Sequence, residues 1–156
     1  MGDELTRKEA KRVRAFRKEL EHWKEILMMD PLWDIRLSVV SDDSKAFSKS
    51  AVERSGKKFI KRSFCDLSKT EYYSGDIGLA RSALSVPESE AEHMRRDTMS
   101  HEMIHFLTAD YHRAALAAAG GDQRVINELA YRYEQLVVRI AAIVCALDAE
   151  IRDEGK

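Results

Sequence analysis

The stretch SHEMIHFL, residues 100–107, holds the side chains best suited to carry chemistry in this chain. His101 and His105 are four positions apart, and on a helix this spacing puts two side chains on one face, with Cβ atoms roughly 5–6 Å apart. Two imidazoles placed in this way can bind one metal ion, and imidazole nitrogen is a common ligand of zinc at about 2.0–2.1 Å. The spacing therefore predicts a zinc site on a helix.

Glu102 lies one residue after the first histidine, rotated by about 100° around the helix. From there its carboxylate can reach a water activated by the metal rather than the metal itself, which is the arrangement of a general base. The alternative is a coincidental pair of histidines that only make hydrogen bonds. A partly buried histidine pair without a metal or an acid partner would cost desolvation free energy, which favours the metal interpretation. The apolar neighbours that indicate such burial are Met99, Ile104, Phe106 and Leu107.

A third ligand is expected, because catalytic zinc sites usually have three protein ligands. If the chain folds into a helical hairpin at Gly120 and Gly121, residues whose numbers sum to about 241 lie side by side. Glu134 is then displaced from His105 by only two residues, roughly 3 Å along the axis. Glu128 would be some eight residues, or roughly 12 Å, too far away. The hairpin therefore predicts Glu134 as the third ligand.

The neighbours of the two glutamates support the same choice. Glu134 has apolar residues at i−4, i+3 and i+7, and a carboxylate at such a border requires a cation. Glu128 has Arg124 and Arg132 four residues to either side, which already offer it surface ion pairs. The alternative for Glu134 is an ordinary border residue that pairs with an arginine.

Downstream residues are weaker candidates for the third ligand. A metzincin would have glycine at position 108 and histidine at 111, but this chain has Thr108 and Tyr111. Asp110 and His112 continue the same helix, and His112 lies roughly 10 Å along the axis from His105. We expect both to be surface residues or residues that support a ligand.

The periodicity of the apolar residues predicts one α+β domain over residues 1–156. Strict alternation predicts half-buried strands at 33–39 and 73–79, with a less regular strand at 58–67. We expect these to form a small, mostly antiparallel sheet, whose glycines mark places of close backbone approach. Helices are predicted at about 5–29, 88–119 and 122–153. The residues from Ser85 to Glu88 resemble a capping box at the start of the second helix. The expected core stripe of the last helix is Val125, Leu129, Tyr133, Leu136, Ile140, Val144 and Leu147.

Composition limits the possible partners. The net charge of −1 gives no general attraction to nucleic acid or to a membrane, although residues 49–69 carry seven basic side chains. We expect that segment to be a solvated loop, with a polyanion site as the alternative. The chain shows no secretory signal and no apolar run of about 18 residues, and Cys65 and Cys145 are expected to be buried thiols. These features predict a cytoplasmic protein.

With HEMIH and the later YEQLVVRIA in view, the chain resembles a small zincin of the gluzincin type. More narrowly, it is similar to the short metallopeptidase-like proteins of phages and prophages, over most of residues 5–147. The resemblance implies a zinc metallopeptidase, a hydrolase in which His101, His105 and Glu134 bind Zn²⁺ and Glu102 is the catalytic base. A zinc-bearing binding or assembly module is the alternative function.

The resemblance also implies a substrate. The SGDIGLA strand would lie at the edge of the cleft and pair with an extended peptide or protein segment, as edge strands can. The residue that would stabilise an oxyanion has no clear match, and Tyr111, His112, Tyr131 and Tyr133 are all conceivable. The sequence predicts no oligomeric state.

Overall fold

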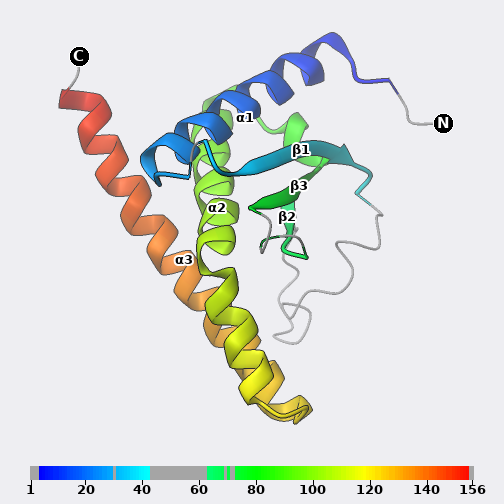
Figure 1. Cartoon of the computed structure of the whole chain (residues 1–156). Coiled ribbons are helices and arrows are strands. Elements are labelled where there is room, and N and C mark those ends of the chain that lie inside the picture. The colour runs from blue at the N-terminus through cyan, green and yellow to red at the C-terminus, as the bar shows by residue number, and fades with distance from the viewer. Residues whose placement is uncertain (1–3, 30, 43–62, 69, 71–72, 155–156) are drawn as a thin grey trace.

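The computed structural model describes residues 4–29, 31–42, 63–68, 70 and 73–154, and it confirms the α+β class (Figure 1). The expected basic loop falls mostly on 43–62 and 69 and so lies outside the described residues. None of the described helices is both long and apolar enough to cross a membrane. In chain order, the elements are α1 (Arg7–Ile26), β1 (Asp34–Val40), β2 (Ser63–Asp66), β3 (Ser74–Ala80), the short 3-10 helix η3 (Arg81–Ser85), α2 (Glu88–Ala118) and α3 (Gln123–Glu154).

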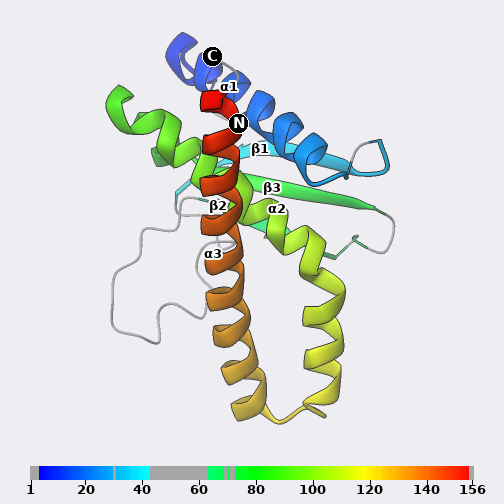
Figure 2. The ribbon, with the colours of Figure 1, turned by 90° about the vertical axis from the view of Figure 1, so that its left-hand side faces the viewer.

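The elements form layers around α2. Helices α1 and α2 pack against the sheet and share one hydrophobic core with it, and α3 lies on the other side of α2 from the sheet (Figures 1 and 2). A smaller apolar cluster, built from Ile104, Val137 and Ala141, joins α3 to α2. The main core consists of Val13, Phe16, Leu20, Trp23, Met29, Ile35, Leu37, Ile77, Leu79, Ala83, Leu84, Met94, Met99, Met103 and Phe106.

The sheet differs from the expectation in its pairing. Its order is β1-β3-β2, with β1 and β3 parallel and β2 and β3 antiparallel, so the sheet is mixed rather than mostly antiparallel. Strand β3, the SGDIGLA segment, is therefore the central strand and not the edge that the resemblance implied. Its residues explain this position, because Ile77 and Leu79 are fully buried on one face and Gly78 and Ala80 are buried on the other.

Two glycines of β3 allow aromatic rings to pack directly on the strand. A Cβ atom on Gly75 would overlap the ring of Phe106 from α2, and one on Gly78 would overlap the ring of Phe64 from β2. The prediction of close approach at these glycines is confirmed. Phe106 follows His105 directly, so this contact holds the histidine-bearing turn of α2 against the sheet.

The hairpin of α2 and α3 has the predicted turn but not the predicted start. Gly120 and Gly121 both have positive φ angles, of 59° and 84°, which glycine adopts without strain. Asp122 then accepts hydrogen bonds from two backbone N–H groups of the first turn of α3. The capping box expected at Ser85 is absent, because Ser85 belongs to η3 and Pro87 precedes the first helical residue without a side-chain cap.

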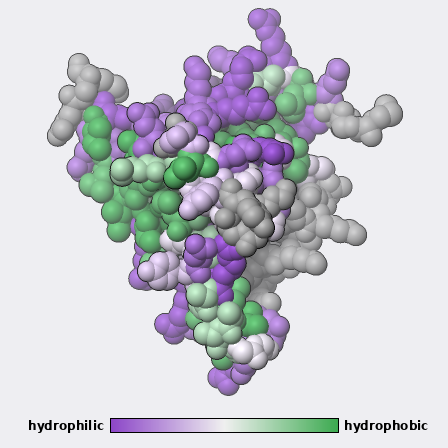
Figure 3. Space-filling model, in the orientation of Figure 1, coloured by the Kyte–Doolittle hydropathy of each residue, from purple (hydrophilic) through white to green (hydrophobic). Residues whose placement is uncertain are grey.

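The buried face of α3 is rotated from the expected stripe. Val137 and Ala141 are fully or almost fully buried, whereas Val125, Leu136 and Leu147 are each more than two-fifths exposed. The reason is that α3 packs mainly against α2, so only a narrow strip of its surface is covered. Figure 3 accordingly shows hydrophobic atoms at the surface on the side where α3 runs.

Candidate metal centre

The structure brings together the three residues that the sequence predicts as metal ligands. His101 and His105 lie on successive turns of α2, and their Nε2 atoms are 3.1 Å apart. Glu134 of α3 reaches both rings, with its Oε1 atom 3.1 Å from Nε2 of His101 and its Oε2 atom 3.3 Å from Nε2 of His105. Two nitrogens and a carboxylate thus converge on one point between the helices.

The packing of the hairpin sets this register. Val137, one turn after Glu134, is fully buried against Ile104 of α2, which fixes the level at which the two helices meet. Glu128, nine residues before Val137, is bonded instead to Arg132, with Oε1 2.6 Å from Nε. The interpretation of Glu128 as a surface ion-pair residue is therefore confirmed.

Glu134 and His101 shift each other's pKa values. Burial opposes the charged form of His101, but the hydrogen bond to Glu134 and the nearby carboxylates outweigh it and raise the pKa of His101. Burial likewise acts to raise the pKa of Glu134, but the hydrogen bonds from both imidazoles outweigh it and hold that pKa well below its usual range. These directions favour positive charge on the ring of His101 and negative charge on the carboxylate of Glu134.

A chain of hydrogen bonds orients His105. The Thr108 hydroxyl donates to the carbonyl oxygen of Ile104 at 2.6 Å, so it must accept from the Tyr133 hydroxyl, 2.8 Å away. Because the single Tyr133 proton goes to this contact rather than to the carbonyl of His105 at 3.3 Å, Oη of Tyr133 can accept from Nδ1–H of His105, also at 3.3 Å. This order of donors leaves Nε2 of His105 with its lone pair toward the site.

The other candidates from the sequence have different surroundings. Tyr111 and Tyr131 are 83% and 55% exposed, and no described contact joins either to the histidine pair. His112 stacks on the ring of Tyr133, with centroids 4.0 Å apart, so it supports the residue that holds His105. Asp110 pairs with Arg113 at 2.7 Å on the surface. The expectations for His112 and Asp110 are confirmed. None of the contacts described for Tyr111, His112, Tyr131 and Tyr133 marks an oxyanion donor.

Glu102 points toward the sheet, where it contacts β2. It is only 4% exposed, and its Oε1 atom accepts a hydrogen bond of 2.5 Å from the Ser63 hydroxyl of β2. Its carboxylate lies outside the group of His101, His105 and Glu134, but it belongs to a second group of ligand-type side chains that also contains His105.

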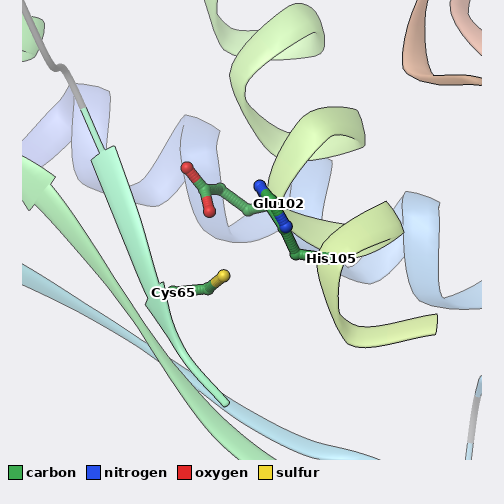
Figure 4. Close-up of side chains that lie close together, drawn as sticks. All are labelled: Cys65, Glu102 and His105. Carbon is green, nitrogen blue, oxygen red and sulfur yellow. The ribbon is translucent and has the colours of Figure 1, made fainter. Parts of the chain in front are cut away.

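Cys65 is a site residue that the sequence reasoning missed. It lies two residues after Ser63 on β2, and its sulfur points toward Glu102 and His105 (Figure 4). The nearest ligand-type atoms of these three side chains all lie within 4.8 Å of one another. The sequence marks Cys65 only as a thiol near apolar residues, and nothing local indicates that β2 packs beside α2.

The donor set fits zinc. Among the described residues, two groups of three metal-binding side chains occur, and they share His105. Imidazole nitrogen, carboxylate oxygen and thiolate sulfur are the donors that zinc takes in proteins, and four such donors suffice for its tetrahedral preference. Comparisons with protein-family models, with curated proteins and with solved structures gave no match to this chain.

Proposed function

We propose that the chain binds one zinc ion through His101, His105 and Glu134 and hydrolyses peptide bonds, with Glu102 as the general base. The convergence of two Nε2 atoms and one carboxylate within 3.3 Å carries this proposal. Bound zinc would supply Lewis-acid chemistry, which polarises a carbonyl and lowers the pKa of a water.

The protein's own part in the reaction is proton transfer and alignment. The Ser63 hydroxyl holds Oε1 of Glu102, so the carboxylate has one fixed orientation, and its second oxygen can take a proton. Glu102 is almost completely buried, and the low local dielectric strengthens its electrostatic interaction with neighbouring groups. His105 is held by Tyr133, so the base and this ligand keep their relative positions.

An extended peptide or protein segment is the substrate class that we propose. Strand β3 is paired on both sides and cannot accept such a segment, but among the described residues β2 is an edge strand of the sheet beside α2. Peptide addition to an edge supplies backbone hydrogen bonds, and alternate side chains of the bound strand would face the site. The two cysteines form no disulfide, and we propose a reducing compartment such as the cytoplasm.

One observation favours the alternative function, a zinc-bearing binding or assembly module of the phage type. An oxyanion donor is not evident among Tyr111, Tyr131, Tyr133 and His112, and such a donor is usually worth about 10²–10³ in kcat. A site without one would hold zinc and bind peptide while cleaving it slowly.

The substitution Glu102→Gln separates the two functions, because it keeps the size of the side chain and removes the base. A peptidase should retain zinc and lose cleavage of unstructured peptides by roughly 10²-fold or more. Glu128→Gln is the matched control, since it alters an exposed glutamate that pairs only with Arg132 among the described contacts. Cleavage that survives in Glu102→Gln would refute the assigned base. Peptide binding without cleavage in the wild type would favour the module.

A further inference from the structure

The thiol of Cys65 lies beside the candidate metal centre. Sγ of Cys65 lies within 4.8 Å of the nearest carboxylate oxygen of Glu102 and of the nearest ring nitrogen of His105. Figure 4 shows the sulfur pointing from β2 toward the gap between these two side chains. His105 also belongs to the group with His101 and Glu134, so the two groups share one ring, which Cys65 approaches from the side of the sheet.

The pairing of β2 fixes this orientation. Side chains alternate along a strand, so Ser63 and Cys65 share one face, and the bond from Ser63 to Glu102 shows that this face lies against α2. Phe64 points to the other face, where it packs on the bare backbone of Gly78. A slip of one residue would turn Phe64 toward α2, so packing on both faces keeps the thiol at the site.

We propose that Cys65 binds the zinc as a thiolate, so that the resting centre is closed by four protein donors: two imidazoles, one carboxylate and one sulfur. This inference rests on the proposed zinc site. Zinc binds thiolate readily, at about 2.3 Å, and sites with four protein ligands are typical of closed centres. On binding, the S–H bond breaks and a zinc–sulfur bond forms, and the carboxylate of Glu102 is placed beside the sulfur to accept the released proton.

The proposal assigns a role to the fourth position. A water or a peptide carbonyl must displace Sγ of Cys65 before it can occupy that position, so the thiol competes with hydrolysis and adds to metal affinity. Cys65→Ser should therefore weaken zinc binding by about tenfold or more, the scale on which groups around a metal tune its affinity.

Cobalt substitution tests the proposal directly, because a thiolate bound to Co²⁺ gives an intense near-ultraviolet charge-transfer band that nitrogen and oxygen ligands do not. We expect the band in the wild type and in Cys145→Ser, and its loss in Cys65→Ser. Cys145 is a matched control because its sulfur contacts Ser100 at 3.0 Å and belongs to neither ligand cluster. The band should scale with cobalt up to one equivalent.

A second measurement does not depend on a variant's folding. Zinc should slow the alkylation of Cys65 by iodoacetamide in the wild-type protein, as followed by peptide mass spectrometry, and should leave the alkylation of Cys145 unchanged. Stoichiometric cobalt without the band, or equal alkylation of Cys65 with and without zinc, would overturn the fourth-ligand inference and leave the zinc site intact. Failure of the wild type to bind either metal would refute the proposed site itself.

Discussion

The substitution Glu134→Ala tests the link between the two long helices and the metal. In the wild type, Oε1 of Glu134 lies 3.1 Å from Nε2 of His101, and Oε2 lies 3.3 Å from Nε2 of His105. Its removal leaves two imidazoles without their anionic partner. Alterations around metal ligands typically cost 10–100-fold in affinity, so loss of a ligand should cost at least that much, or about 1.4–2.7 kcal/mol.

Competition with a chromophoric chelator measures this loss directly. The control is Glu128→Ala on the same helix, where the glutamate lies at the surface and pairs with Arg132. An i,i+4 ion pair of this kind is worth only about 0.3–0.5 kcal/mol, so zinc affinity should be almost unchanged. Alanine favours helix, and circular dichroism should therefore show that both variants keep their helices.

The outcome that would refute the reasoning is a reversed result. If Glu128→Ala released zinc and Glu134→Ala retained it, the register of the α2–α3 hairpin would be wrong. If neither substitution changed the affinity, the metal would bind elsewhere in the chain.

Three further predictions concern the support of the site and of the fold. Tyr133→Phe should lower zinc affinity by about tenfold, because it removes the acceptor of Nδ1–H of His105. Chelator competition measures this affinity, and an unchanged value would contradict the role of Tyr133. Gly75→Ala should destabilise the protein by about 1–3 kcal/mol in urea unfolding, because the new methyl group must displace the buried ring of Phe106; equal stability would contradict the close contact. The hydrogen bond from Arg81, with those from Thr6, lowers the pKa of Glu9 from 4.5 to about 2, so the folded chain binds this proton more weakly than the unfolded chain. Its stabilisation is then present above pH 4.5 and lost as the pH falls toward 2; Glu9→Gln should flatten the stability profile over that window, and an unchanged profile would refute the assignment.

The parts of the site that the sequence predicts depend on local geometry. On a helix, the spacing of His101 and His105 puts both side chains on one face. The two glycines at 120 and 121 form the tight turn that brings the next helix alongside. Helical rise then places Glu134 level with the histidines to within a few ångströms, and the structure has it in contact with both.

The parts that the sequence does not predict depend on long-range pairing. Alternation in the SGDIGLA strand indicates a strand but not its neighbours, so the parallel pairing with β1 and the central place of β3 could not be foreseen. Cys65 enters the site only because β2 packs beside α2, and no local pattern encodes that contact. The rotation of α3 has the same cause, since Leu136 and Val137 are both apolar and only packing decides which is buried.

The metal content of the purified protein tests the central claim most directly. Elemental analysis of the wild type, of His101→Ala and of His105→Ala, each loaded with zinc and passed through a desalting column, gives the stoichiometry of tight binding. We predict about one zinc per chain in the wild type and much less in both variants, because each substitution removes one of three converging ligands. Equal zinc in all three proteins, or none in the wild type, would contradict the account.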